Sequence, residues 1–482
     1  MRCTEKIPVP IPRPERPNTL PTSSESKSTG NGSTIVFSGK RLTLEDAVFL
    51  GLRGNRTIRS AYIDRVSQKF GLRVAEDRFN PHFGITGNIS RQRIADRAST
   101  TLDVSPGFSL ITKTGATIDF AWNSSANWQE PGNAFSSAFQ IGIEQPLLRG
   151  AGLDVNLAPV QTARLGELVN KLRLKATISQ TIAGTIVAYR SVLSAQQQLQ
   201  LAQASLERSQ DLLSINNALI AAGRLAPMEA VQTQADIEAQ RLAVLQSRQT
   251  LETSRLVLLD LLALDLDTKI VAVENVDPRR VNTDIAKLMQ VALSERQDYL
   301  GQAYVIEQNR LGVTVASNEQ LWDVSLYAKA RAGTQFSEGL GSDRIADVTA
   351  GLKFTIPIND LGREKRLVDA STSYQNATLQ LQAIRSGIEM QVRGTASQVD
   401  LLWQQLDVAE KSRDLALQAV TIEKAKLNAG RSTTFQVQSL ETNLRSSESQ
   451  LLNARIGYLN ALTQLDLQLG TTLATWRIDL RD

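Results

Sequence analysis

The chain has 482 residues, of which 42% are hydrophobic and 5% aromatic, and its formal net charge is +4. This length and apolar content allow a sizeable core and more than one domain. Positive and negative side chains alternate along the chain instead of clustering, which excludes the basic footprint of a nucleic-acid-binding protein. A single histidine, His82, and a single cysteine, Cys3, exclude a His/Cys metal cluster and an internal disulfide.

No group of residues in the sequence has the spacing of a catalytic site. There is no nucleophile with a base, no pair of carboxylates in a strand-end setting and no metal-ligand spacing. Gly39 and Lys40 resemble the end of a phosphate-binding loop, but Arg41 replaces the Ser or Thr that such a loop needs. Even the apolar run 256–266 contains two aspartates and is too short for a membrane-spanning helix, whereas amphipathic strands stay open. We therefore expect no enzyme, no cofactor and no metal.

Residues 1–41 are predicted to be a disordered leader, because they are rich in Pro, Ser and Thr. They lack the apolar core of an export signal, so an exported protein would need a missing segment or a different start. Cys3 resembles the lipidated first residue of a mature lipoprotein, although Arg2 is not the small residue expected before such a cysteine. The alternative is an inert thiol in a disordered tail.

The first folded element is predicted to be a helix over residues 43–79, with Thr43 and Asp46 forming a capping box at its start. Alternating apolar and polar residues within 82–143 then predict strands with one apolar face. The stretch 95–133 forms either an extended surface hairpin or a rival first pair of strands.

Each strand region ends at a proline and is followed by long helices. Pro146 ends the first region, because proline lacks the amide proton that a sheet needs. Helices are predicted over 159–221 and 227–264, and small apolar residues at heptad spacing along the first of them indicate coiled-coil packing. The second half repeats this order, with a helix over 284–322, strands within 324–356, and helices over 363–428 and 434–469.

An Ala-Gly-Arg motif occurs at 222–224 and again at 429–431, about 207 positions later. Each copy separates two helical runs, so each is expected to form the tip of a helical hairpin. The chain is therefore predicted to contain a duplicated unit. Its parts are the leader of residues 1–41, a first repeat over 42–270, a second repeat over 271–470 and a tail over 471–482.

The strand regions predict about four strands per chain. Four strands cannot close a membrane barrel, which needs at least ~8, and an open edge in lipid leaves backbone groups unpaired at several kcal/mol each. We therefore expect an α+β fold of duplicated helix–strand–strand–hairpin units, assembled as a homotrimer with a β-barrel of ~12 strands continued by a long α-helical barrel. Lipid should contact Phe83, Ile85, Phe139, Ile141, Val324, Leu326, Leu352 and Phe354. The lumen should receive Lys329, Arg331 and Lys353.

The Leu-Thr-Leu-Glu-Asp-Ala opening at 42–47, the Gln-Pro-Leu-Leu-Arg-Gly junction at 145–150 and the Ala-Gly-Arg tips together resemble the TolC family of outer-membrane efflux proteins, over about residues 42–470. The resemblance implies a passive export duct of a tripartite efflux pump or a type I secretion system, located in the outer membrane and extending into the periplasm. The implied partners are two further copies of the chain, a periplasmic membrane-fusion adaptor, an inner-membrane pump or ABC transporter, and outer-membrane lipid. The substrate is not indicated.

The resemblance also implies a set of functional residues near the tips. Gly223 and Gly430 match the tip glycine that lets an adaptor approach, although Arg224 and Arg431 stand where relatives commonly carry Leu or Thr. The alternative, compatible with the first, is that both glycines end helices as left-handed caps.

Relatives narrow the pore with aspartates at positions that here hold Glu229, Gln436 and Ser439. Only Glu229 keeps a charge, so a weaker acidic ring and a less cation-selective mouth are expected. The alternative for Glu229 is an ordinary acidic residue in the first turn of a helix.

Two other functions fit parts of the sequence. A periplasmic adaptor would contain one helical hairpin and a lipoyl-like motif, whereas two hairpins are predicted here. A soluble coiled-coil scaffold would leave the amphipathic strands unexplained.

Overall fold

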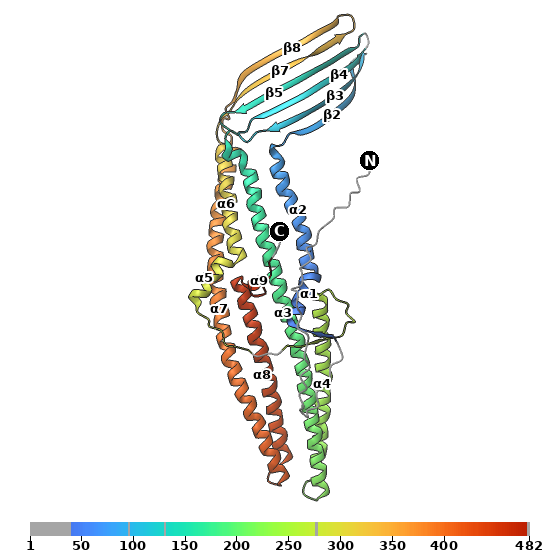
Figure 1. Ribbon diagram of the computed structural model, residues 1–482, viewed down its shortest axis with the longest axis vertical. Coiled ribbons are helices and arrows are strands. Elements are labelled where there is room, and N and C mark those ends of the chain that lie inside the picture. The colour runs from blue at the N-terminus through green and yellow to red at the C-terminus, as the bar shows by residue number, and fades with distance from the viewer. Residues whose placement is uncertain (1–39, 95–96, 130–131, 275–277, 480–482) are drawn as a thin grey trace. The chain divides into compact units, whose positions relative to one another are not determined.

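A computed structural model of the protein describes residues 40–94, 97–129, 132–274 and 278–479 (Figure 1). By their internal contacts these residues form two compact units. The hairpin unit combines the described parts of Met1–Tyr62, Leu174–Gln297 and Arg385–Asp482, and the sheet unit combines those of Ile63–Arg173 and Asp298–Ile384. Each unit therefore draws on both halves of the sequence. Cys3 and the predicted leader up to residue 39 lie outside the described residues.

The sheet unit contains a six-stranded antiparallel sheet in the order β2-β3-β4-β5-β7-β8. Its strands are β2 His82–Ile94, β3 Arg97–Ile111, β4 Thr117–Gln129, β5 Ala134–Pro146, β7 Asp323–Ser337 and β8 Gly341–Thr355. Six strands correct the expectation of about four. The stretch 95–133, which the sequence left undecided, supplies β3 and β4 as full members of the sheet, because their apolar residues alternate in phase with those of their neighbours.

One face of this sheet is apolar across all six strands. Directly opposed residues of antiparallel strands lie on the same face, and the register pairs Phe83 with Phe108 and Phe108 with Phe120. The ring centroids of Phe83 and Phe108 lie 5.5 Å apart with the rings tilted, and those of Phe108 and Phe120 lie 5.5 Å apart with the rings stacked. By this register the apolar face holds every residue that was expected to contact lipid: Phe83, Ile85, Phe139, Ile141, Val324, Leu326, Leu352 and Phe354. Lys329, Arg331 and Lys353 lie on the opposite face.

The two upstream helices are each broken once, where single helices were expected. The first consists of α1 Leu44–Gly54 and α2 Arg56–Glu76, followed by the short 3-10 helix η1 Asp77–Phe79, and the second of α5 Ile285–Glu295 and α6 Gln297–Asn318. Asn55 breaks the first, because its ψ of 128° is not helical and its Oδ1 accepts the amides of Thr57 and Ile58 as the cap of a new helix. Arg296 has an extended backbone at the second break.

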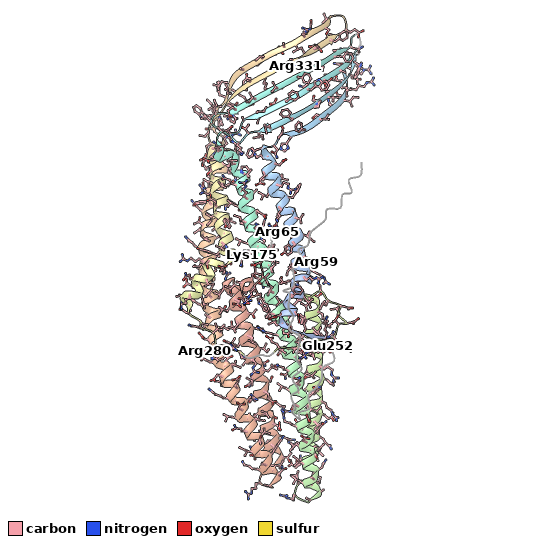
Figure 2. The ribbon with its side chains drawn as sticks, in the orientation of Figure 1. Arg59, Arg65, Lys175, Glu252, Arg280 and Arg331 are labelled. Atoms are coloured by element: carbon pink, nitrogen blue, oxygen red, sulfur yellow. The ribbon has the colours of Figure 1, made fainter. Side chains whose placement is uncertain are left out.

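The capping box predicted at the first helix is confirmed. The Thr43 hydroxyl accepts the amide of Asp46, and the Asp46 carboxylate accepts the amide of Thr43. In the sheet unit, Arg65 of α2 (Figure 2) forms two hydrogen bonds of 2.7 and 2.6 Å with Glu167 of α3. Both side chains are nearly buried, so this bidentate pair fixes α2 against α3 at one height.

Four long helices form two hairpins close to the predicted bounds. They are α3 Leu153–Ala221, α4 Met228–Leu261, α7 Leu361–Asn428 and α8 Thr434–Leu469. At 69 and 68 residues, α3 and α7 are each about 100 Å long and contribute to both units. Among the described residues, no helix has a stretch long and apolar enough to cross a membrane.

A small parallel sheet and a buried tyrosine join the two halves of the sequence in the hairpin unit. Strand β1 Lys40–Leu42, which begins within the predicted leader, pairs with β6 Ile270–Ala272. The hydroxyl of Tyr189, on α3, donates to the carbonyl of Leu42 at 2.9 Å and accepts the amide of Val273 at 3.0 Å. The described part of the predicted tail contains the short helix α9 Thr472–Thr475. Leu473 within it and Trp476 after it pack on an apolar cluster of α1, α2 and α3.

Candidate functional site at the hairpin tips

The two hairpin tips of the hairpin unit have the same backbone geometry. Gly223 follows α3 with a φ of +73°, and Gly430 follows α7 with a φ of +74°. Each glycine amide donates to the carbonyl three residues earlier, and each following arginine amide donates to the carbonyl five residues earlier. This pair of bonds is a Schellman motif, which favours glycine because other residues adopt a positive φ at a cost. Both glycines therefore end helices as left-handed caps, and their contact with an adaptor stays a prediction.

The two tip glycines differ in what covers them. A Cβ atom added to Gly430 would overlap a guanidinium nitrogen of Arg224, whereas nothing lies within 4 Å of the same point at Gly223. Arg224 therefore extends from the first tip across the backbone of the second. The reciprocal contact is not made among the described residues: Arg431 is exposed and does not lie over Gly223.

Polar side-chain contacts join the two sides of the second tip. The Ser432 hydroxyl donates to the Glu423 carboxylate at 2.5 Å, and the Lys426 ammonium lies 3.0 Å from the same carboxylate. The pKa of Glu423 is held below its usual value mainly by the hydrogen bond from Ser432 and to a smaller extent by Lys426. Thr433 then caps α8 by accepting the amide of Gln436. At the first tip α4 begins after Pro227, which offers no side-chain cap.

The predicted pore residues lie on two helices. Glu229 is half-buried in the first turn of α4, and its Oε2 atom is buried without a hydrogen-bond partner among the described residues. Gln436 and Ser439 are exposed on α8. Within the part of the chain that the structure describes, no hydrogen bond or ion pair joins the Glu229 side chain to Gln436 or Ser439. Their meeting in one ring stays a prediction that needs several copies of the chain.

Ser439 lies in an open groove between α4 and α8. The groove has a volume of about 410 Å³ and is lined by Gln232, Asp236, Phe435, Gln438, Ser439, Thr442 and Asn443. Phe435 is 64% exposed, so this groove next to the second tip offers an aromatic ring surrounded by amides and hydroxyls. That combination suits a protein surface rather than a small charged ligand.

Behind the tips, a fully buried polar cluster joins the two hairpins. Asn216 of α3 donates to the hydroxyl of Thr233 at 2.8 Å and accepts the hydroxyl of Thr434 at 3.1 Å. The side chain of Gln438 donates to Thr233 at 3.2 Å. Asn216, Thr233 and Thr434 are 0% exposed. Because a buried polar group is costly without its partner, this cluster fixes α3, α4 and α8 in one relative position.

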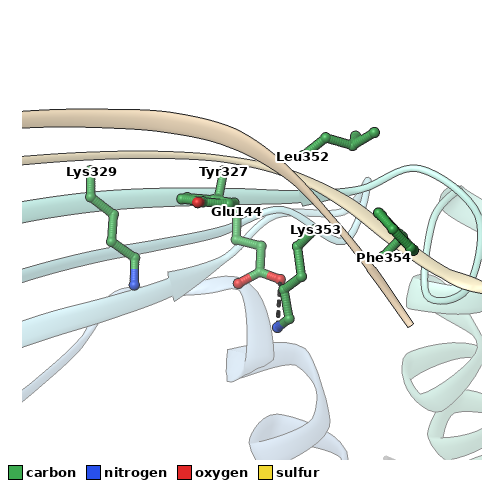
Figure 3. A pocket seen from close by; sticks show the side chains of 6 residues that line it. All are labelled: Glu144, Tyr327, Lys329, Leu352, Lys353 and Phe354. Carbon is green, nitrogen blue, oxygen red and sulfur yellow. Dashed lines mark ion pairs between the residues drawn. The ribbon is translucent and has the colours of Figure 1, made fainter.

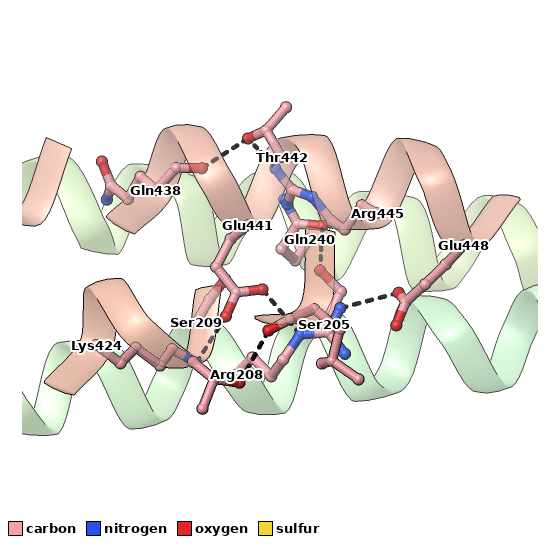
Figure 4. Close-up of polar contacts among 12 residues, drawn as sticks. Ser205, Arg208, Ser209, Gln240, Lys424, Gln438, Glu441, Thr442, Arg445 and Glu448 are labelled. Carbon is pink, nitrogen blue, oxygen red and sulfur yellow. Dashed lines mark hydrogen bonds and ion pairs between the residues drawn. The ribbon is translucent and has the colours of Figure 1, made fainter. Parts of the chain in front are cut away.

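A charged cluster lies further along the same helices (Figure 4). Arg208 of α3 contacts Glu441 at 2.9 Å and Glu448 at 3.1 Å, both on α8, and Lys424 of α7 contacts Glu441 at 2.6 Å. Arg445 of α8 lies 3.6 Å from Asp236 of α4. The charges thus join all four helices. Reasoning from the sequence missed both clusters. Ser209 of α3 donates to Asp236 at 2.7 Å, and this polar residue within a packed helix was the visible signal for the charged cluster.

The sheet unit contains a second open pocket beside β5, β7 and β8, lined by residues of both faces (Figure 3). It has a volume of about 550 Å³ and is lined by Glu144, Tyr327, Lys329, Leu352, Lys353 and Phe354. Glu144 accepts the Ser325 hydroxyl at 2.7 Å and lies 3.5 Å from the Lys353 ammonium. Figure 3 shows the Glu144, Lys329 and Lys353 side chains on one side of the sheet and Leu352 on the other. This ion pair suits a wall that faces water. The lining residues include no nucleophile with a neighbouring base.

Comparison with known proteins agrees with this architecture. The sequence profile described as outer membrane efflux protein matches residues 51–264 and 288–471. No curated protein matches the sequence significantly.

Several solved outer membrane channels and proteins have a similar fold. The CmeC outer membrane channel of Campylobacter jejuni has a TM-score of 0.67 at 17% identity, over 89% of this chain and 85% of that one. The outer membrane protein VceC of Vibrio cholerae has 0.68 at 15%, over 89% and 96%. The open state of the MtrE outer membrane channel of Neisseria gonorrhoeae has 0.65 at 15%, over 89% and 88%. At these identities the likeness concerns the fold alone.

Proposed function

Since the chain belongs to the outer membrane efflux protein family, we propose that three copies form a passive duct of a tripartite efflux pump or a type I secretion system. The family comprises outer membrane efflux channels with a periplasmic extension, which are not enzymes and typically assemble as trimers. In the proposed assembly the duct carries substrates across the periplasm and the outer membrane, and an inner-membrane pump or ABC transporter supplies the energy.

The apolar face of the sheet carries this proposal. Trp128, Phe135 and Phe336 form a row on that face, with centroid distances of 6.3 Å for each neighbouring pair. Exposed aromatic rings in a row above an apolar band are typical of strands that contact lipid at the membrane interface. The opposite face, with Lys329, Arg331 and the Glu144–Lys353 pair, suits a water-filled lumen.

The hairpin tips are the proposed contact with a periplasmic membrane-fusion adaptor. Gly223 presents open backbone, Gly430 is covered by the exposed Arg224 side chain, and Arg431 is exposed beside it. Arginines at these positions favour an adaptor surface that offers carboxylates or free carbonyl groups, because guanidinium binds such acceptors in pairs.

The first experiment is to express the chain behind a working export signal and purify it from the outer membrane. We expect a trimer by native mass measurement and ionic conductance in a planar bilayer. A water-soluble monomer or dimer that never inserts would contradict the duct and leave a soluble scaffold as the better account.

The adaptor contact is tested in a bacterium that lacks its own efflux channel and carries a panel of adaptor and pump pairs. We expect Arg224→Ala with Arg431→Ala to reduce drug resistance restored by the chain, while the amount of trimer in the outer membrane stays the same. Lys411→Ala, an exposed change on α7, is the matched control. Equal resistance in the arginine variant would show that these side chains make no productive contact.

Glu229→Gln tests the proposed acidic ring. We expect the purified channel to lose part of its cation preference, measured as the reversal potential in a salt gradient, because three carboxylates leave the pore mouth. Glu238→Gln, an exposed change on the same helix, should leave the reversal potential unchanged. An unchanged potential in Glu229→Gln would favour the alternative of an ordinary first-turn acid.

A further inference from the structure

The sheet has two more strands than closure by ~12 strands in a trimer requires, and neither outer edge is occupied. Within the described residues, β2 pairs only with β3 and β8 pairs only with β7. Each free edge exposes a row of backbone amide and carbonyl groups over most of 13 to 15 residues.

Both edges carry the apolar face, so both would meet lipid. On β2, Phe83 is 79% and Ile85 77% exposed, and on β8, Val348 is 84% and Phe354 68% exposed. Unpaired backbone groups in the hydrocarbon of a membrane cost several kcal/mol each. The edges of a lipid-embedded sheet therefore need partners, and β2 and β8 run antiparallel because strands alternate in direction across the six-stranded sheet.

The extra hairpin of β3 and β4 is part of the wall and not a surface loop. Its apolar face continues a row of phenylalanine rings in contact, from Phe83 through Phe108 to Phe120. Its polar face has its own hydrogen bonds, from the Ser125 hydroxyl to Asp103 at 2.6 Å and from the Ser105 hydroxyl to Asn123 at 3.0 Å. The hairpin thus has one face for lipid and one for water, as a pore wall requires.

We propose that β8 of each copy pairs with β2 of the next, so that three copies close a sheet of three times six, or 18, strands. The partner of each edge is a second copy of this chain, and the inference rests on the trimeric duct proposed above. At equal strand tilt the diameter of a closed sheet grows with strand number, so this one is about 1.5 times as wide as a closure by 12 strands. Its lumen has about twice the cross-section, and it admits correspondingly bulkier solutes through the outer membrane.

Cysteine pairs across the edges test the pairing. In a Cys3→Ser background, one cysteine replaces Thr86, Asn88 or Ser90 of β2 and one replaces Asp347, Thr349 or Lys353 of β8. All six positions lie on the polar face, where opposed side chains come within disulfide reach. We expect at least one pair to form a disulfide-linked trimer. The matched controls place the β8 cysteine at Val348, on the other face, and should not cross-link.

The width is tested on the same channel with Lys329→Cys, a position on the polar face. Maleimide-linked polyethylene glycols of increasing mass are added outside intact cells, where the helical part cannot limit their entry. Deletion of residues 97–129 removes β3 and β4 and preserves the alternation, because odd-numbered residues of both β2 and β5 lie on the apolar face. We expect larger polymers to label the full chain than the deletion variant.

The outcomes separate this inference from the proposed function. Absence of a trimer and of conductance would contradict both. A conducting trimer in which no same-face pair cross-links would overturn the 18-stranded sheet alone, and so would equal size limits in the full chain and a trimeric deletion variant. If the deletion variant fails to assemble, the cross-linking result decides.

Discussion

The two hairpin tips have nearly the same sequence and the same turn, yet their surroundings differ. At the second tip Arg224 covers Gly430 and Ser432 binds Glu423, whereas at the first tip Gly223 is open. The positions that correspond to Glu423 and Ser432 in the first copy are Asn216 and Leu225. A repeated local motif thus determines the turn, and the residues around it give each copy its own packing.

Removing Asn216 should have the largest effect, because only the first copy places a buried amide between three helices. Asn216→Ala leaves the hydroxyls of Thr233 and Thr434 without one of their partners, and we expect a loss of about 1–3 kcal/mol in stability. Chemical denaturation followed by circular dichroism, at fixed protein concentration, measures it. Asn217→Ala, at the exposed neighbouring position, should change stability by less than about 0.5 kcal/mol. Equal effects would show that the cluster contributes nothing.

Substituting the two tip glycines by alanine should have smaller effects on stability, and these effects should differ from each other. Gly223→Ala and Gly430→Ala each force alanine into a left-handed conformation, which costs about 1–2 kcal/mol. Gly430→Ala must also move the far end of the flexible, exposed Arg224 side chain, which yields at little cost, so we expect it to be only slightly the more destabilising of the two. Arg224→Ala should abolish the difference, as a double-mutant cycle by denaturation would measure. A difference that persists without Arg224 would contradict the proposed contact.

The smallest effect concerns acid stability. A carboxyl whose folded pKa is lowered, as at Glu423, contributes stability above its unfolded pKa of about 4.3, and this is lost as the pH falls through the folded value. Ser432→Ala removes the main cause, so we expect a smaller loss of thermal stability between about pH 5 and about pH 3 than in the unmodified chain. Ser412→Ala, exposed on α7, should keep the full loss. Identical pH profiles for the two variants would exclude a role for the Ser432 bond.

Much of the helical part could be predicted from the sequence. The heptad seam and the Ala-Gly-Arg repeat predicted α8 at its observed bounds and α7 to within two residues of its start. The breaks at Asn55 and Arg296 were missed, because one residue with a non-helical backbone interrupts the helical hydrogen bonds without disturbing the spacing of apolar side chains.

The number of strands and the polar clusters could not be predicted from the sequence in the same way. Pro106 lies in the middle of β3 and argues against a central strand, since proline cannot donate to a neighbouring strand. The cluster around Asn216 joins residues from three helices that are far apart in the sequence, and no local pattern encodes such a meeting. The turn glycines were predictable, because a left-handed helix cap requires a positive φ at a single position and glycine adopts it readily.

The order of the strands along the chain has a consequence for biogenesis. Strands β2 to β5 are consecutive and can form a meander from local contacts, but β5 must wait for β7, and the whole of α3, α4, α5 and α6 lies between them. Pairing over such a separation is slow, because the closure entropy of the intervening chain opposes it. During export from the N-terminus the first four strands therefore spend time as an incomplete sheet with an apolar face and a free edge. In the interval before β7 and β8 arrive, the exposed apolar face and free edge of this incomplete sheet are the part of the chain most prone to aggregation.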